Sequence, residues 1–110
     1  MTTSPAFQRG DVVLLTFPFT SGARGKSRPA LVVLDTGDAD VVLARVTTRR
    51  YSTPADILLN QWSAAGLAAP SVARLHKVIT VEKALIAQTL GALHPDDRRE
   101  VDGVLSHLYG

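Results

Sequence analysis

Short apolar runs separated by polar turn residues dominate the first half of the chain. Three of them, DVVLLTF, PALVVL and VVLARV, are rich in β-branched and aliphatic residues and predict strands over residues 11–17, 29–34 and 41–46. Gly37 and Asp38, between the second and third runs, predict a tight hairpin turn. We therefore expect consecutive antiparallel strands in this half of the chain.

The pattern is less regular in the second half. Residues 61–66 (QWSAAG) predict one helical turn that ends at a glycine, and SVARLHKVITV predicts a long strand over 71–81. Two interpretations of residues 82–93 stay open: a turn followed by a short strand around 87–90, which we favour, or a helix. We expect Trp62 to pack in the core or in a dimer seam.

The last segment predicts an amphipathic helix. Pro95 suits the first helical position, and Asp96 and Asp97 place negative charge at the positive end of the helix dipole. One apolar stripe at i, i+3, i+4 and i+7 consists of Val101, Val104, Leu105 and Leu108. Short antiparallel strands with one helix favour a mainly β (α+β) fold, a small, strongly bent SH3-like barrel whose end the helix covers.

The composition of the chain limits its size class and excludes functions that depend on cysteine. The 110 residues, 45% of them hydrophobic, suffice for one domain over residues 1–110, and a homodimer would cover apolar surface that so small a domain leaves exposed. A chain without cysteine has no disulfide, no thiolate zinc site and no cysteine nucleophile. Because we find no signal sequence and no apolar run of membrane length, we expect a soluble, cytoplasmic protein that does not bind membranes.

Charge is distributed unevenly. Residues 1–54 contain seven Lys or Arg and four Asp, a net charge of +3, whereas residues 55–110 contain five Lys or Arg and six Asp or Glu, a net charge of −1. Two glycines predict that PFTSGARGKSR, residues 18–28, forms an exposed basic loop. The candidates for binding phosphate are Arg24, Lys26, Arg45, Arg49, Arg50 and Arg74. The alternative is a solvated basic face without a ligand.

The sequence GDVVLLTFPFT, followed by the basic loop and by RPALVV, resembles the MazF/PemK family of toxins from type II toxin–antitoxin systems. That family has a G-D-aliphatic strand, an F-x-[PF]-T turn, a variable basic loop and an R-P-[AV]-aliphatic strand. VTT at 46–48 resembles the end of the family's third strand and SVARL at 71–75 its long strand, so the resemblance covers nearly the whole chain. It implies a dimeric SH3-like barrel, and a metal-independent, sequence-specific endoribonuclease that cleaves single-stranded mRNA without a cofactor and so inhibits translation and growth.

The resemblance also implies roles for particular residues. Arg28 and Thr47 correspond to the catalytic pair, and Thr20 and Ser21 to the edge that contacts the RNA. Guanidinium donors match phosphoryl oxygens, and a hydroxyl can serve a phosphate oxygen or the 2′-hydroxyl. Arginine is a poor base, with a pKa of roughly 12.5 or above, so the general base stays unassigned. The basic residues that flank this pair best are Arg24, Lys26, Arg49 and Arg50.

Other interpretations of these residues stay open. Arg28 can be a surface arginine that pairs with Asp11 or Asp35. Side chains alternate along a strand, so only one of Thr47 and Thr48 faces the barrel, and we choose Thr47. A tyrosine that follows two arginines, at position 51, can stack on a base or be partly buried. The histidines lack metal-ligand spacing, so we expect no metal site, and His76, His94 and His107 are interpreted as surface residues. The alternative for His76 is a position near the groove.

A basic groove favours an acidic partner. In the family this partner is a small antitoxin, and its acidic or amphipathic tail would lie in the groove and compete with RNA. Two other functions stay open: a CcdB-like toxin that inhibits gyrase by binding it, and a non-catalytic SH3-like module that binds nucleic acid or an antitoxin.

Overall fold

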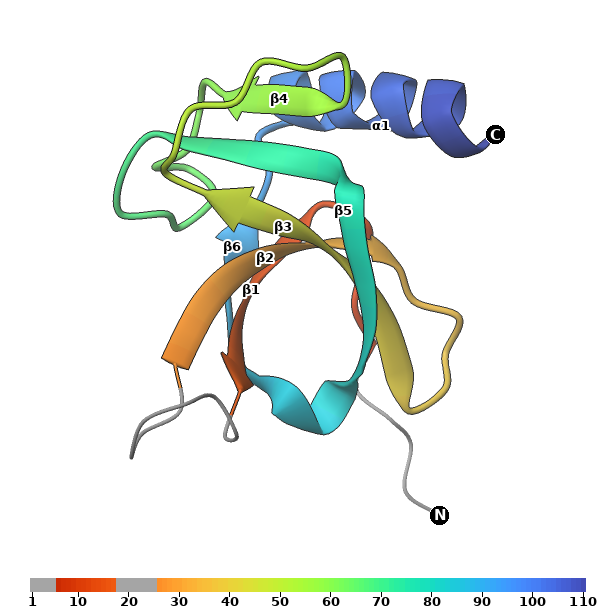
Figure 1. The fold of residues 1–110 in the computed structure, drawn as a ribbon. Helices are drawn as coiled ribbons and strands as arrows, with labels where there is room; N and C mark the ends of the chain where they lie inside the picture. Colours follow the sequence, from red (N-terminus) through yellow and green to blue (C-terminus); the bar gives the residue numbers. More distant parts are fainter. Residues whose placement is uncertain (1–5, 18–25) are drawn as a thin grey trace.

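The structure, a computed structural model, describes residues 6–17 and 26–110. Its strands form one antiparallel sheet in the order β4-β5-β3-β2-β1-β6. The elements are β1 (Asp11–Phe17), β2 (Lys26–Leu34), β3 (Asp40–Thr47), β4 (Asp56–Leu59), β5 (Ser71–Glu82), the 3-10 turn η1 (Lys83–Leu85), β6 (Ile86–Ala92) and α1 (Pro95–Tyr109). The sheet curls strongly, and α1 lies across one end of it beside β4 (Figure 1).

Most of the predicted elements are confirmed. The strands over 11–17, 29–34, 41–46 and 71–81 and the helix from Pro95 are present, and residues 82–93 form a turn and a strand rather than a helix. The predicted hairpin joins β2 to β3, with a connection over residues 35–39 that is longer than the tight turn expected.

Two predictions are wrong in part, and one strand was missed. Residues 61–66 form turns, with hydrogen bonds from Ala65 N to Trp62 O and from Gly66 N to Ser63 O, and not a helical turn. Strand β4 was not predicted. The basic loop is shorter than the expected range of residues 18–28, because residues 26–28 belong to β2. The remaining residues of the expected loop, 18–25, lie outside the described residues.

The sheet is curved but not closed, since β4 and β6 are its two edges. Its sharpest change of direction is in β5, where Arg45 of β3 pairs with Arg74 but the preceding Ala44 pairs with Val78. The residues between these two partners, 75–77, have no partner in β3, and β5 bends there (Figure 1). The prediction of a bent, mainly β fold with one C-terminal helix is therefore confirmed, and the sheet that forms this fold is open and curved.

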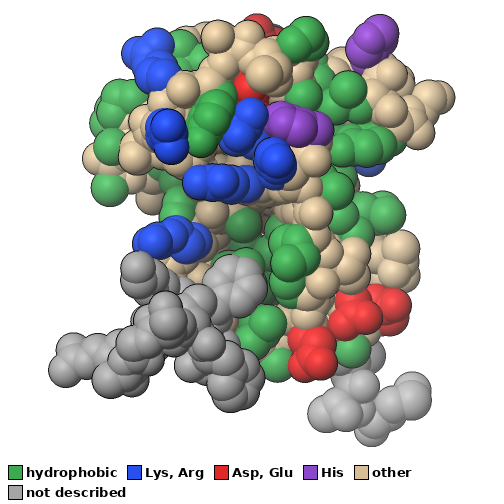
Figure 2. Space-filling model, viewed as in Figure 1, with side chains coloured by type: hydrophobic (Ala, Val, Ile, Leu, Met, Phe, Trp, Pro, Cys, Tyr) green, Lys and Arg blue, Asp and Glu red, His purple; other side chains and the backbone are tan. Residues whose placement is uncertain are grey.

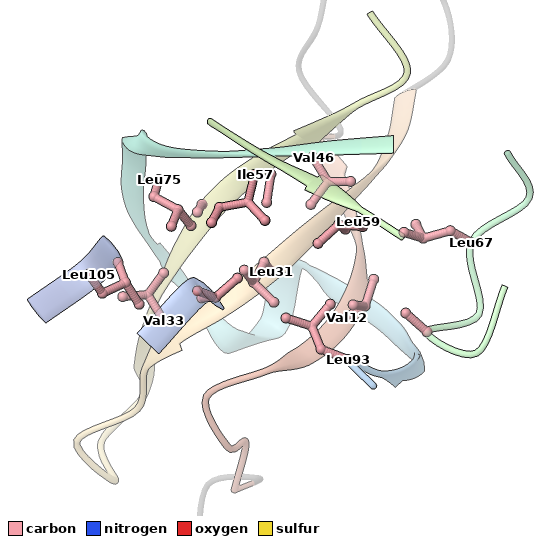
Figure 3. Close-up of a cluster of buried hydrophobic side chains, with 14 residues drawn as sticks. Val12, Leu31, Val33, Val46, Ile57, Leu59, Leu67, Leu75, Leu93 and Leu105 are labelled. Carbon is pink, nitrogen blue, oxygen red and sulfur yellow. The ribbon is translucent and has the colours of Figure 1, made fainter. Parts of the chain in front are cut away.

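The alternation of side chains along the strands divides the core into two clusters, one on each face of the sheet. The larger cluster includes Leu31 and Val46 and is covered by Ile57 and Leu59 of β4 and by the helix (Figure 3). The smaller cluster contains Val13, Leu15, Ala30, Val32, Val41, Leu43 and Val81. Trp62 is partly buried against the larger cluster, which confirms its expected place in the core.

Helix α1 packs on the sheet through Val101 and Leu105, and at its end the Tyr109 hydroxyl donates to the carbonyl of Leu75. Val101 and Leu105 are buried and Val104 is partly buried, but Leu108 is 37% exposed, so the buried stripe is shorter than predicted. The buried Asp97 accepts hydrogen bonds from the backbone N–H groups of the two residues after β4, at positions 60 and 61. No helix among residues 6–17 and 26–110 is long and apolar enough to cross a membrane.

Candidate active site

A pocket of about 620 Å³ opens where β2 and β3 stop pairing. The last backbone pair between the two strands is Ala30 with Arg45. Beyond it, β2 continues beside β1, where Arg28 pairs with Leu15, and β3 continues beside β5, where Thr47 pairs with Val72. The pocket is lined by Leu15, Ser27, Arg28, Pro29, Ala30, Leu43, Ala44, Arg45, Val46, Thr47, Thr48, Ser71 and Ile79.

Pro29 explains why the strands separate at this point. Proline has no backbone N–H to donate, so it weakens a ladder, and the pairing with β3 ends at the next residue, Ala30. Proline also restricts the residue before it to extended backbone conformations. Arg28 is thereby held in the strand conformation at the mouth of the pocket.

Arg28 is exposed, and its side chain has no hydrogen bond or ion pair with any described residue. The alternative that it pairs with Asp11 or Asp35 is wrong. Asp11 accepts the backbone N–H of Gln8. Asp35 forms a buried ion pair with Lys83 at 2.9 Å. The Arg28 guanidinium is therefore available to an anion that enters the pocket.

Thr47 lies on the other side of the opening, and its hydroxyl has a defined neighbour. Its Oγ1 accepts the backbone N–H of Arg49 at 3.1 Å, which leaves the hydroxyl hydrogen free to donate to a bound group. If the β2–β3 register is continued two residues beyond the last pair, Arg28 and Thr47 stand opposite each other. Thr48 also lines the pocket, so the structure places both threonines there.

The segment after β3 is held by a buried ion pair. Arg74 Nε donates to Asp56 Oδ1 at 2.8 Å, and the two side chains are only 9% and 1% exposed. Thr53 donates to the second carboxylate oxygen from its backbone N–H and from its hydroxyl. Burial raises the pKa of Asp56, but the hydrogen bonds from Arg74 and Thr53 outweigh it and lower that pKa to about 2.

The same arginine covers Tyr51. The guanidinium carbon of Arg74 is 3.5 Å from the centre of the tyrosine ring, and that of Arg49 is 5.5 Å away. Tyr51 is partly exposed, which fits the expectation of partial burial. Arg74, one of the six candidate phosphate contacts, is buried, and Asp56 neutralises its charge, which argues against that role.

The remaining predicted RNA contacts fall into two groups. Arg49 and Arg50 are exposed beyond the end of β3, and Arg50 lines a second pocket of about 580 Å³ with Tyr51 and Thr53. Lys26 begins β2, whereas the others lie outside the described residues: Thr20, Ser21 and Arg24. Figure 2 shows Lys and Arg side chains gathered over the upper and middle part of one face, with most of its exposed acidic side chains at the lower edge.

The histidines lie outside the pocket. His94 caps α1 by accepting the backbone N–H of Asp96, His107 is exposed on the helix, and His76 Nε2 is 3.5 Å from Arg74 Nη2. Within the described part of the chain, no three His, Asp or Glu side chains gather as metal ligands would.

Two lining residues received less weight in the sequence analysis than their position warrants. Arg45 was one of six basic candidates and was not preferred, although it stands two residues before Thr47, a spacing that puts both side chains on one face of a strand. Ser71 was not singled out at all. Its hydroxyl donates to the carbonyl of Ala69 at the edge of the pocket, and nothing in the sequence distinguishes it from other serines.

The family model that describes the PemK-like, MazF-like toxin of type II toxin–antitoxin systems matches residues 8–109. The chain belongs to this family. The resemblance in the GDVVLLTFPFT and RPALVV segments is therefore confirmed over almost the full length.

Solved structures agree with the fold of a MazF-like toxin. An endoribonuclease in complex with its cognate antitoxin from a mycobacterial species superposes with a TM-score of 0.71 at 21% identity, over 93% of each chain. MazF from Deinococcus radiodurans gives a TM-score of 0.69 at 24% identity, over 96% of this chain and 97% of the other. The MazE–MazF structure from the same organism gives a TM-score of 0.70 at 24% identity, over 91% of this chain and 92% of the other.

Proposed function

We propose that this MazF-like toxin is a metal-independent endoribonuclease that cleaves single-stranded mRNA at short sequences in the cytoplasm, and that residues 1–110 act as one toxin domain. The observation that carries the proposal is the pocket lined by Thr47 and by Arg28, which has no acidic partner among the described residues. Family membership and the likeness to endoribonucleases with an antitoxin support it. Among residues 6–17 and 26–110, no Asp or Glu lines this pocket, so a polyanion meets donors there and no carboxylate of the described residues repels it.

The reaction we propose needs no group from outside the RNA to form the new bond. The 2′-hydroxyl attacks the adjacent phosphorus and loses its proton, the bond from phosphorus to the 5′-oxygen breaks, and that oxygen takes up a proton. The products are a 2′,3′-cyclic phosphate and a 5′-hydroxyl. Negative charge on the non-bridging oxygens rises as the 2′-oxygen adds, and the fixed donors of Arg28 stabilise that charge.

Thr47 has a narrower role. Its oxygen accepts the Arg49 N–H, so its own hydrogen is directed to a phosphate oxygen or to the 2′-oxygen of the bound nucleotide. The group that removes the 2′-hydroxyl proton is not among the roles we assign. Arg49, Arg50 and Lys26 supply positive charge for the flanking phosphates, together with Arg24, Thr20 and Ser21 of the β1–β2 connection, and RNA binding therefore weakens steeply with salt.

An antitoxin is the protein partner of this proposal. Its acidic or amphipathic tail would occupy the basic face and exclude RNA from it. Complexes with an antitoxin among the structural relatives support this arrangement. A cognate antitoxin tail that left RNA binding unchanged in a competition assay would contradict it.

The quaternary structure is part of the proposal. We infer an SH3-like barrel subunit that forms a homodimer, supported by Leu34, Val78 and Tyr109, which are 47%, 41% and 58% exposed around one apolar depression beside Leu105. A second copy would bury this surface. Sedimentation equilibrium that gives a monomer at micromolar concentration would contradict the dimer.

The test is cleavage of a long unstructured RNA in EDTA, with mapping of the cut ends. Wild type should cut at a short recurring sequence and leave cyclic phosphate ends, whereas Arg28→Ala should not cut. Thr47→Ser, which keeps the hydroxyl, should retain activity and Thr47→Val should lose it. The matched control is Arg99→Gln, which removes one exposed positive charge on α1. Absence of cutting by folded wild type would exclude the nuclease, and gyrase inhibition and cleavage-free RNA binding would be measured next.

A further inference from the structure

Two arginines of the described part of the chain line the pocket. Arg28 enters it from β2 and Arg45 from β3, and both side chains are exposed. Neither forms a hydrogen bond or ion pair with a described residue, unlike Arg74 on the neighbouring strand, which is buried against Asp56. Two like charges that share a depression repel each other unless an anion lies between them.

The register of the strands defines how the two groups are placed. Arg45 pairs directly with Ala30, and Arg28 stands two residues before Ala30 on the same face. β2 and β3 no longer pair beyond Ala30, but both arginines line the same pocket, so their long side chains can approach one small group from two strands. Thr47 shares the face of Arg45, so three residues with donor groups line one pocket from two strands.

Part of the pocket lining is apolar and buried. Leu15, Ala30 and Leu43 line the pocket, and all three belong to the smaller buried cluster. Such apolar side chains lower the dielectric on one side of the pocket, which strengthens the attraction between an arginine that lines it and an oxyanion.

We propose that Arg45 is a second catalytic arginine, which binds one non-bridging oxygen of the scissile phosphate while Arg28 binds the other. This inference rests on the proposed ribonuclease function. The phosphate carries one negative charge in the substrate and two when the 2′-oxygen has added, so a pair of donors on its two oxygens binds the transition state more strongly than the substrate. Arg45 therefore affects the chemical step more than the binding of RNA.

Arg49 and Arg50 differ from Arg45 in this respect. Neither residue lines this pocket. The Arg49 guanidinium lies over the Tyr51 ring, and Arg50 lines the second pocket. In this proposal Arg49 and Arg50 contact the phosphates that flank the cleavage site. Loss of one such contact lowers the affinity for RNA and reduces the salt dependence of RNA binding, but it does not change the rate of the chemical step.

The first test compares Arg45→Gln and Arg45→Lys with wild type on an RNA that contains the mapped cleavage sequence. We expect kcat to fall about 100-fold in Arg45→Gln, the loss typical of one transition-state donor, and less in Arg45→Lys. The affinity for the same RNA with a 2′-deoxy residue at the cleavage site, which cannot react, should change no more than a few-fold. Arg99→Gln, the matched charge control, should match wild type in both measurements, and circular dichroism checks the fold of each variant.

The second test identifies the atom that Arg45 contacts. Sulfur replaces each non-bridging oxygen of the scissile phosphate in turn, and the two diastereomers are assayed separately. One diastereomer should slow wild type strongly and slow Arg45→Gln much less, because the contact it disturbs is already absent in the variant. Equal sulfur effects in the two proteins, or a loss in affinity with unchanged kcat, would overturn the inference and leave the nuclease proposal intact. If wild type cuts no RNA, both proposals are wrong.

Discussion

The buried pair of Arg74 and Asp56 allows a sharp test of how the segment after β3 is held. The two residues face each other across β4 and β5, and the substitution is Asp56→Asn. The asparagine keeps the size of the side chain but removes its charge. Its amide can accept from Arg74 or from the Thr53 N–H through its one oxygen, so one of these two donors meets an NH₂ group.

The size of the effect follows from two considerations. A pKa of Asp56 lowered from 3.8 to about 2 corresponds to about 2 kcal/mol in favour of the ionised folded form. Removal of one partner of a buried ion pair typically costs roughly 3–5 kcal/mol, because the other charge stays buried without compensation. We expect Asp56→Asn to lower the free energy of unfolding at pH 7 by about 3 kcal/mol, and Tm by roughly 15 °C.

The pH dependence has a definite sign. Because the pKa of Asp56 is depressed in the folded state, its contribution is complete above its ordinary value near 3.8 and is lost as pH falls towards 2. Asp35 behaves in the same direction, since hydrogen bonds from Phe7 N, Lys83 and Gly37 N lower its pKa to about 2. Wild type should therefore lose stability between about pH 5 and pH 2, and Asp56→Asn should lose less.

Urea denaturation followed by circular dichroism, at pH 7 and in steps down to pH 3, measures both effects. The matched control is Asp38→Asn, an exposed aspartate whose only described contact is the backbone N–H of Asp40, and it should stay within about 0.5 kcal/mol of wild type. The difference between wild type and Asp56→Asn should shrink as pH falls. Equal stabilities at pH 7, or a difference that widens in acid, would refute the reasoning.

Two further predictions concern other buried contacts. Lys83→Met leaves the Asp35 carboxylate, 4% exposed, without the cation 2.9 Å away, and should lower the free energy of unfolding by about 3 kcal/mol in urea denaturation at pH 7; a loss below about 1 kcal/mol would contradict it. Gly66→Ala should be more destabilising than Gly37→Ala by about 2 kcal/mol or more in the same assay. Both glycines have positive φ, but a Cβ at Gly66 would lie 2.2 Å from Leu90 O and one at Gly37 meets nothing within 4 Å, so equal losses would show that the close approach is unimportant.

The sequence predicted the elements whose pattern is strong. β1, β3, β5 and α1 have long apolar runs or clear caps, and their bounds agree with prediction to within one or two residues. β4 was missed although Ile57 and Leu59 alternate with polar or exposed positions, because four residues between turns give a weak signal. The bend in β5 was not predictable from the sequence either, because it depends on which residues of β3 pair with Arg74 and Val78.

The site was predictable only where a motif named its residues. Arg28 and Thr47 stand out through the resemblance, and the structure puts both at one pocket. The ion pair that neutralises Arg74 was not predictable from a motif. A strand arginine in a basic half of the chain resembles a phosphate contact, and only the pairing of β4 with β5 places Asp56 beside it. Long-range partners decide whether a charge is free or neutralised, and a single sequence does not contain them.

The Arg28-Pro29 pair connects the sequence motif to the site in physical terms. A proline inside a strand normally weakens a sheet, yet here it lies where the loss of a ladder hydrogen bond separates β2 from β3. The gap it leaves exposes donors from both strands, Arg28 on one side and Thr47 on the other, above a floor of buried aliphatic side chains. The same ring restricts the backbone of Arg28 to the extended conformation that carries its side chain to the opening. One residue thus both opens the pocket and positions the arginine, which explains why R-P is informative as a pair, whereas either residue alone is common on protein surfaces.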